Sequence, residues 1–214
     1  MRDACRQWDD AGPDSEPIWV FGYGSLMWDP GFDYAECHWV RLDGWHRQFS
    51  ICSTQAWGSV RRPGLCLALH AGGAAAGMVY RLNGAGYRAI MAALDQRERA
   101  YRKVSVNVCL PDTETVSAVT YVYDPAHPRS RHDLPLAEQA ALIAGGSGEK
   151  GTSRGYLEKT IAVLAQNSCA EPYLTALYRA VARHDSICSA PIRASFDNVI
   201  FRSVEREADD VIRS

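Results

Sequence analysis

The order of periodic segments along the chain constrains the fold more than any other feature of the sequence. Strand-like patterns fill the earlier part, interrupted by one helix-like segment from Tyr87 to Arg99, and helix-like patterns fill the later part. A doubly wound parallel sheet requires strands and helices to alternate, and this chain lacks that alternation. The sequence therefore predicts an α+β fold, with a mostly antiparallel, curved sheet or small mixed β-barrel flanked by helices.

Turn residues divide the strand-like region. Asp43-Gly44 is the expected turn of a hairpin from His38 to Cys52, and Ala71-Gly72-Gly73 is expected to join two separate strands. The other expected strands cover residues 18–21, 64–70, 77–82, 104–110 and 116–123.

Capping residues set the expected limits of the later helices. One helix from Leu136 to Ala144 should end at Gly145-Gly146. A second should be capped by Thr152 or Ser153. A third should begin at Pro172, because proline is favoured in the first turn of a helix.

The chain has 214 residues, which suits one domain with short extensions. Residues 1–16 are polar and rich in Asp, Gly and Pro, which predicts a flexible leader. We expect the domain to cover residues 17–185. Residues 186–214 are expected to form a C-terminal extension, whose one apolar run is Val199-Ile200-Phe201.

Charge and cysteine content exclude several classes of protein. The formal net charge is −2 at pH 7, which disfavours nucleic-acid binding. The sequence shows neither a signal peptide nor an apolar run long enough for a bilayer, so we expect a soluble, cytoplasmic protein without a membrane partner. The seven cysteines include no CxxC pair, and in apolar runs such as those around Cys52 and Cys109 they are expected to be buried and reduced.

Common catalytic signatures fail on this sequence. The segment from Gly146 to Thr152 has its lysine in the wrong order for a phosphate-binding loop, and a helix rather than a strand precedes it. Ser25 lacks the flanking glycines of a nucleophile elbow. The six histidines form no ligand pair at helical spacing, so no metal site is predicted.

The segment from Val20 to Trp28 carries the most informative pattern. A strand ends at Gly22, and Gly22 and Gly24 leave the following backbone N–H groups without side-chain cover. Such a loop can bind an anion, or a carbonyl oxygen that becomes negative during a reaction. The alternative is an ordinary turn after a strand.

Several runs, in order and at similar spacing, resemble the ChaC-like γ-glutamylcyclotransferases. The first is Phe-Gly-Tyr-Gly-Ser-Leu-Met-Trp at residues 21–28, and the likeness extends over roughly residues 18–180. The further matching runs cover residues 44–49, 53–54, 62–65, 77–82, 94–98 with Tyr101, 118–122 and 156–157.

This resemblance implies a small mixed, mostly antiparallel barrel flanked by helices, with the ligand at one rim. It also implies an enzyme that splits γ-glutamyl peptides, chiefly glutathione, into 5-oxoproline and, for glutathione, cysteinylglycine, without a metal or organic cofactor. The residues matching the family's substrate-binding positions are Tyr23, Gly24, Ser25, Leu26, Met27, Trp28 and Tyr156.

Glu98 matches the catalytic glutamate of the family. Without the resemblance, the run from Gln96 to Arg99 would indicate a solvated, charged helix face, and Tyr156 would indicate core packing. In the implied reaction the α-amino group of the substrate attacks its own γ-carbonyl, with Glu98 as general base and then general acid. Burial beside Leu94 and Tyr101 is expected to raise the pKa of Glu98.

The chain departs from the family at residues 57–61, Trp-Gly-Ser-Val-Arg, where members carry Arg-Gly-Thr-Pro-Glu. The preferred leaving group is therefore open, and other γ-glutamyl amino acids or γ-glutamyl amines are alternatives to glutathione. A non-catalytic domain that binds γ-glutamyl compounds or 5-oxoproline is a further alternative. We expect a monomer or weak homodimer.

Overall fold

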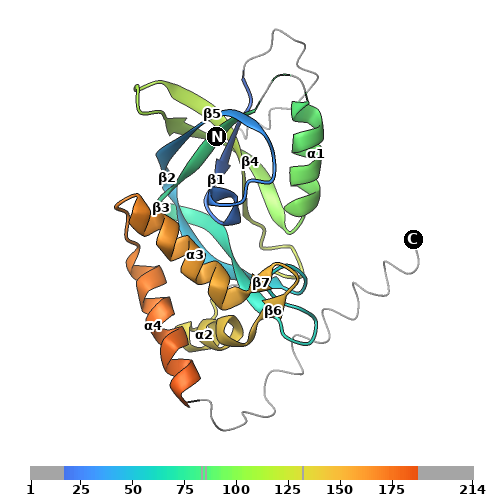
Figure 1. Cartoon of the computed structure of the whole chain (residues 1–214), viewed down its shortest axis with the longest axis vertical. Helices are drawn as coiled ribbons and strands as arrows, with labels where there is room; N and C mark the ends of the chain where they lie inside the picture. Colours follow the sequence, from blue (N-terminus) through green and yellow to red (C-terminus); the bar gives the residue numbers. More distant parts are fainter. Residues whose placement is uncertain (1–16, 83, 85, 132, 188–214) are drawn as a thin grey trace, which may run out of the picture.

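A curled sheet forms the centre of the computed structural model, which describes residues 17–82, 84, 86–131 and 133–187 (Figure 1). The predicted leader at 1–16, the run Val199-Ile200-Phe201 and all but the first two residues of the predicted extension at 186–214 lie outside the described residues. The strands of this sheet are β1 (Trp19–Gly22), β2 (Tyr34–Ser53), β3 (Gly64–Leu82), β4 (Tyr101–Cys109) and β5 (Thr115–Tyr123).

The sheet confirms the predicted α+β class and its mostly antiparallel pairing. Its strand order is β2-β3-β1-β5-β4, and β1 with β5 is the one parallel pair among neighbouring strands of the described chain. The edge strands β2 and β4 approach each other without pairing in the described region. The predicted barrel is thus an open sheet that curls toward closure.

The two turns predicted within the β2 and β3 regions are wrong. Asp43 pairs with Ala74 and Trp45 pairs with Ala71, so that Gly44 lies opposite Gly72 and Gly73 in one continuous ribbon. These glycines have φ angles of 82°, 96° and 72°, which other residues rarely adopt. They therefore form a bulge that bends the ribbon instead of reversing the chain.

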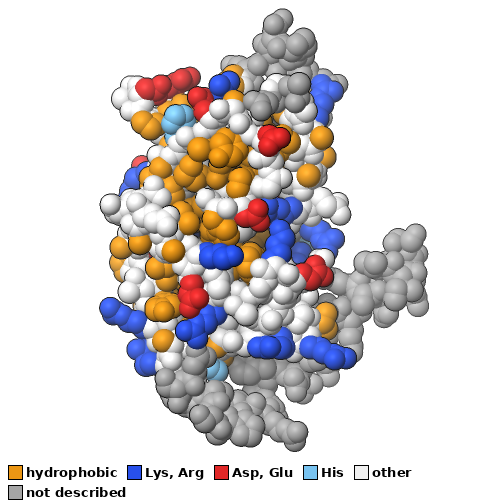
Figure 2. Space-filling model, in the orientation of Figure 1, with side chains coloured by type: hydrophobic (Ala, Val, Ile, Leu, Met, Phe, Trp, Pro, Cys, Tyr) orange, Lys and Arg blue, Asp and Glu red, His pale blue; other side chains and the backbone are white. Residues whose placement is uncertain are grey.

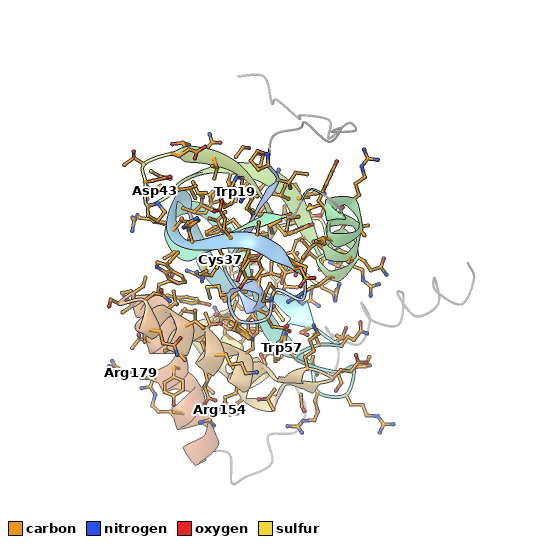
Figure 3. The ribbon with its side chains drawn as sticks, turned by 45° about the horizontal axis from the view of Figure 1, so that its top comes forward. Trp19, Cys37, Asp43, Trp57, Arg154 and Arg179 are labelled. Atoms are coloured by element: carbon orange, nitrogen blue, oxygen red, sulfur yellow. The ribbon has the colours of Figure 1, made fainter. Side chains whose placement is uncertain are left out.

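The chain reverses instead between β2 and β3, at residues 54–63. Figure 3 shows the consequence: Asp43 lies at the far end of the ribbon, and Trp57, in the reversal, lies close to the helices.

Each predicted helix is present at its expected place in the described part of the chain. The helices are α1 (Tyr87–Arg97), α2 (Leu136–Gly145), α3 (Ser153–Gln166) and α4 (Pro172–Ile187). Thr152 caps α3 by accepting a hydrogen bond from the Gly155 amide at 3.0 Å. The short elements are the 3₁₀ helix η1 (Ser25–Met27) and the strands β6 (Ser147–Gly148) and β7 (Gly151–Thr152).

The helices cover the sheet from two directions. Helices α2, α3 and α4 pack against one another, and α2 and α3 also contact β3, whereas α1 lies on the opposite side of the molecule (Figure 1). Val20 and Phe21 alternate along β1 and point to opposite faces of the sheet. Phe21 belongs to the large core beneath α2–α4, and Val20 belongs to a smaller core beneath α1. The residues that follow β1 therefore lie between these two packed cores.

Two further observations concern cysteines and membrane segments. All five cysteines in the described region are free thiols, and Cys52 and Cys66 are buried as expected. Cys109 is exposed, contrary to expectation, because the inward positions at this end of β4 are taken by Val106 and Val108. Among the described residues, no helix is long and apolar enough to cross a membrane.

Candidate active site

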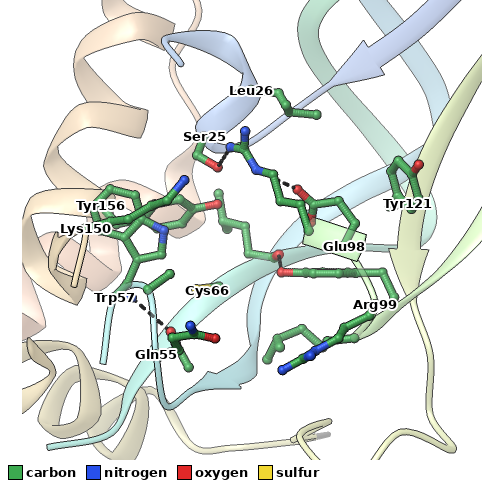
Figure 4. A pocket seen from close by; sticks show the side chains of 18 of the residues that line it. Ser25, Leu26, Gln55, Trp57, Cys66, Glu98, Arg99, Tyr121, Lys150 and Tyr156 are labelled. Atoms are coloured by element: carbon green, nitrogen blue, oxygen red, sulfur yellow. Dashed lines mark hydrogen bonds and ion pairs between the residues drawn. The ribbon is translucent and has the colours of Figure 1, made fainter. Parts of the chain in front are cut away.

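A cavity of about 480 Å³ opens where β1 ends, within the size range usual for small-molecule sites. Its walls come from the β1–η1 segment, the end of α1, the chain reversal after β2, the β6–β7 hairpin and the start of α3. In Figure 4, Ser25 and Leu26 lie at the top, Lys150, Tyr156 and Trp57 at the left, Glu98 and Tyr121 at the right, and Gln55 and Arg99 at the bottom.

Glu98 lines this cavity and does not lie on a solvated helix face. Helix α1 ends one residue earlier, and the Glu98 amide caps it by donating to the Leu94 carbonyl at 2.8 Å. The Tyr101 amide donates to the Glu98 carbonyl at 2.9 Å, which closes a tight turn into β4. Only 16% of the Glu98 side chain is exposed. The helix end thus turns this carboxylate inward.

The environment of Glu98 favours its protonated form. Burial raises the pKa of its carboxyl group, and the charges of Arg97 and Lys150 act in the opposite direction. The raised pKa agrees with the sequence-based expectation. A carboxyl group that can hold and release a proton nearer to neutral pH suits general acid–base chemistry.

The glycine-containing loop, Tyr23–Trp28, forms the upper wall. Its first four residues line the cavity, and its last two, Met27 and Trp28, do not. The amides of Met27 and Trp28 donate to the carbonyls of Gly24 and Ser25 at 2.9 and 3.2 Å. These two amides are therefore used within the loop, and any anion contact falls to the part from Gly24 to Leu26.

Gly24 is required by close packing. A Cβ atom at this position would lie 2.4 Å from the Tyr156 hydroxyl oxygen, well below contact distance. The backbone of the loop consequently approaches the cavity directly, as the sequence pattern predicted for a glycine-bearing turn.

Tyr156 fits both interpretations of its sequence position, as a cavity residue and as a core residue. It lines the cavity, and it is also a core residue with only 4% exposure. Its ring contacts those of Trp28, Phe49 and Trp57, with centroids 5.4, 5.7 and 5.1 Å away. Burial raises the pKa of its hydroxyl, which is therefore neutral at ordinary pH.

Two arginines hold the Tyr23–Trp28 loop, and sequence reasoning assigned neither to the site. Arg97 donates to Ser25 Oγ at 2.9 Å and to the Pro30 carbonyl at 3.1 Å, and its Nε lies 3.2 Å from Glu98 Oε1. Arg47 donates from Nε to the Tyr23 carbonyl at 2.7 Å and forms an ion pair with Glu171. In the sequence, Arg97 belongs to a charged run typical of a solvated helix face, and Arg47 is a single arginine in a strand.

The cavity also contains a thiol that burial keeps in its protonated form. Cys66 lines the floor, and burial raises the pKa of its thiol to about 12. Its neutral form predominates at pH 7, and the thiolate is the reactive form. In the described region, no group of three or more His, Cys, Asp or Glu side chains could hold a metal ion.

The remaining wall comes from two segments that contain none of the predicted site residues. Trp57, in the segment that departs from the family pattern, lines the cavity, as does Lys150 from the β6–β7 hairpin. The hairpin is fixed to the chain reversal through the Lys150 amide, which donates to the Ala56 carbonyl at 2.8 Å. The hairpin sequence resembles a phosphate-binding loop only superficially, and that pattern carries no signal for this contact.

Comparison with known proteins identifies the family. The family model described as ChaC-like protein matches residues 18–184. The glutathione-specific γ-glutamylcyclotransferase of Escherichia coli K12 is 38% identical over 157 residues, and the match covers 72% of this chain but only 65% of that protein's length. The rat glutathione-specific γ-glutamylcyclotransferase 1 is 30% identical over 158 residues, with 70% of each chain covered.

A solved structure supports the fold. The crystal structure of the yeast γ-glutamylcyclotransferase specific to glutathione superimposes with a TM-score of 0.74 at 22% identity, covering 79% of this chain and 97% of that one. Family model, relatives and fold therefore agree, and this chain belongs to the ChaC-like protein family.

Proposed function

We propose that this protein is a γ-glutamylcyclotransferase that splits glutathione into 5-oxoproline and cysteinylglycine. The observation that carries the proposal is that Glu98, a carboxyl group with a raised pKa, lines the same cavity as Tyr23–Leu26. The names of the E. coli and rat relatives support glutathione as the substrate.

In this reaction the substrate supplies its own nucleophile. The α-amino nitrogen of the γ-glutamyl group bonds to the γ-carbonyl carbon, a five-membered ring forms, and the amide bond to the cysteine nitrogen breaks. Holding the nitrogen and carbon about 3 Å apart in a cavity supplies much of the rate enhancement. This agrees with a site where the Cys66 thiol stays protonated and Ser25 Oγ is bound by Arg97.

Glu98 would transfer the proton between the two nitrogens. The attacking amine must lose a proton, and the departing cysteine nitrogen must gain one. A single carboxylate can accept the first proton and donate it to the leaving group, provided that its pKa lies close to the working pH. Burial of Glu98 shifts its pKa in that direction.

The Tyr23–Trp28 loop would hold negative charge at the other side of the reacting carbonyl. Backbone N–H groups in a glycine-bearing turn favour an anion, either the α-carboxylate or the developing oxyanion. Lys150 lies near Ser25 in Figure 4 and adds a positive charge to the same end. We assign the loop and Lys150 to binding of the γ-glutamyl group.

The direct test is 5-oxoproline release from glutathione by the pure protein. Glu98→Gln should lower kcat by about 10²- to 10⁴-fold, the range typical of a lost general acid–base group. Glu158→Gln is the matched control, because Glu158 lies on α3 outside the cavity and pairs only with Arg154 in the described region. Undiminished turnover in Glu98→Gln would remove this mechanism.

Glu149 provides an internal check on the assignment. It is the second carboxylate that lines the cavity. If Glu149→Gln abolished release and Glu98→Gln did not, the general base would have been assigned to the wrong acid.

A second candidate keeps the chemistry and changes the leaving group. Trp57 lines the cavity at a position where the family pattern has an arginine. Comparing kcat/KM for glutathione, γ-glutamyl amino acids and γ-glutamyl amines would separate the two, and a clear preference for glutathione would eliminate this version. Binding of 5-oxoproline with no turnover of any of these compounds would instead favour a non-catalytic role.

A further inference from the structure

We propose that Arg129, together with Arg99, forms a carboxylate-binding subsite that selects γ-glutamyl peptides whose leaving group ends in a free carboxylate. The inference rests on the proposed function and deepens it, because it names the residues that recognise the leaving group. None of the comparisons or sequence patterns described above assigns a role to either arginine.

The charge balance of the cavity first indicates an anionic ligand with more than one negative group. Four cationic side chains line it, against two carboxylates, Glu98 and Glu149. Arg97 is engaged with Glu98, and Gln55 Nε2 lies 3.5 Å from Glu149. Within the described chain, the other three cations, Arg99, Arg129 and Lys150, form no ion pair with a carboxylate. Figure 2 shows Lys and Arg side chains gathered near the middle of the face drawn.

Arg129 carries the most specific observation. Its Nε atom is buried, and in the described part of the chain it has no hydrogen-bond partner. A buried donor without an acceptor is costly, and most such groups in proteins are paired. A guanidinium group presents Nε and a terminal nitrogen side by side, which matches the two oxygens of a carboxylate. A ligand carboxylate in the cavity would supply the acceptor that Arg129 lacks.

The backbone around Arg129 is firmly fixed to the sheet. Its carbonyl accepts a hydrogen bond from the Cys52 amide at 2.8 Å, and the Arg131 amide donates to the Ser50 carbonyl at 2.7 Å. A β-bridge between Ile51 and Ser130 completes the attachment. Arg129 is thus held on a rigid wall, as a residue that reads a ligand should be.

This wall lies away from the Tyr23–Trp28 loop. Arg129 is attached to the end of β2 at residues 50–52, which pairs with the Cys66 end of β3, whereas β1 pairs with residues 78–81 of β3. The loop and Arg129 therefore come from opposite halves of the β2–β3 ribbon. Cys66 on the floor is near enough to both Glu98 and Arg129 for their charges to act on its thiol.

The separation fits a dipeptide leaving group. With the scissile bond beside Glu98, a two-residue extended leaving group reaches about 7 Å beyond the scissile nitrogen. We place its terminal carboxylate at the end where Arg99 lies in Figure 4, across the cavity from Ser25. The two carboxylates of a γ-glutamyl tripeptide therefore meet two separate groups of cations.

Paired ligands test this subsite without turnover. In the Glu98→Gln background, calorimetry should show glutathione binding about tenfold more tightly than its C-terminal glycinamide, since a charge-assisted hydrogen-bonded pair is lost in the amide. Adding Arg129→Gln should reduce that ratio to about twofold or less. Adding Arg179→Gln instead should leave the ratio unchanged, because Arg179 is exposed on the outer side of α4 (Figure 3).

Steady-state kinetics provide a second test of the Arg129 subsite. In an otherwise wild-type chain, Arg129→Gln should raise KM for glutathione about tenfold with little change in kcat, and leave the kinetics of the glycinamide unchanged. Arg99→Gln, at an exposed position, should show a smaller change of the same kind. Equal affinity of both peptides in Glu98→Gln, or equal loss for both in Arg129→Gln, would overturn the subsite.

The two proposals fail differently. If wild-type protein binds the carboxylate peptide preferentially through Arg129 but releases no 5-oxoproline, the subsite stands and the proposed activity falls. If it releases 5-oxoproline from both peptides at equal kcat/KM, the activity stands and the subsite falls.

Discussion

An arginine paired with a glutamate holds the Tyr23–Trp28 loop on its inner side, and a second such pair holds it on its cavity side. The two pairs differ in what they do. On the inner side, the Arg47 side chain is fully buried and its partner Glu171 is 18% exposed. On the cavity side, Arg97 is 23% exposed and its partner Glu98 is 16% exposed. Both arginines donate to loop atoms, Arg47 to the Tyr23 carbonyl and Arg97 to Ser25 Oγ.

The difference lies in the surroundings of the glutamate. The Arg47–Glu171 pair joins β2 to the start of α4 across the large core, away from the cavity. The Arg97–Glu98 pair joins two neighbouring residues that both line the cavity. One pair therefore supports the fold behind the loop, and the other holds a carboxylate in front of it and opposes the effect of burial on the pKa of that carboxylate.

The largest expected effect is on stability, from Arg47→Met. The substitution leaves the Glu171 carboxylate and the Tyr23 carbonyl without their donor. Breaking a buried ion pair by removing one partner typically costs about 3–5 kcal/mol. We expect a loss of this size in the free energy of unfolding, measured by urea denaturation.

Arg41→Met is the control for this substitution. Arg41 also lies on β2 and pairs with Asp43, but the two side chains are 71% and 77% exposed. An exposed pair contributes about 0–1 kcal/mol, so this variant should unfold close to wild type. Equal losses in the two variants would remove the structural role given to Arg47.

The next effect is on activity, from Arg97→Met. The charge of Arg97 lowers the pKa of Glu98, against the larger effect of burial. Its loss should raise that pKa further, move the acid limb of kcat/KM to higher pH, and lower kcat/KM at pH 6 about tenfold. The loss of stability should be smaller than in Arg47→Met. Arg102→Met, at an exposed position on β4, is the control, and an unchanged pH profile in Arg97→Met would contradict the assignment.

The smallest expected effect concerns the stability of Glu98→Gln. The unfolded chain releases the Glu98 proton near the ordinary pKa of 4.5, and the folded chain releases it at higher pH. Between these values the folded state binds the additional proton, so the free energy of unfolding falls as pH rises through the window. Above it, the buried carboxylate lowers stability.

Glu98→Gln should therefore melt at a higher temperature than wild type at pH 8, and at nearly the same temperature at pH 4. Scanning calorimetry at the two pH values, with Glu158→Gln as control, measures this difference. A variant that melts below wild type at pH 8 would show that Arg97 stabilises the Glu98 carboxylate more than burial destabilises it.

Local patterns in the sequence predicted local structure well. The cap at Thr152, the proline at the start of α4 and the glycines after α2 all act through neighbouring backbone groups, so they can be identified without the fold. The same reasoning failed at Gly44 and Gly72-Gly73, because a glycine with positive φ suits a turn and a bulge equally. The structure shows a bulge, because Gly44 lies opposite Gly72 and Gly73 within the β2–β3 ribbon.

The sequence by itself determined the α+β class, the family and the glycine-bearing loop, and it made Glu98 the candidate acid–base residue, because each depends on residues close together or on motifs in order. The tertiary structure alone decided which charges meet. Arg47 finds Glu171 124 residues away, and Arg129, Lys150 and Trp57 reach the cavity of Glu98 from three separate segments. Burial and pairing over such distances depend on how the sheet curls and where the helices pack, and no local pattern encodes either.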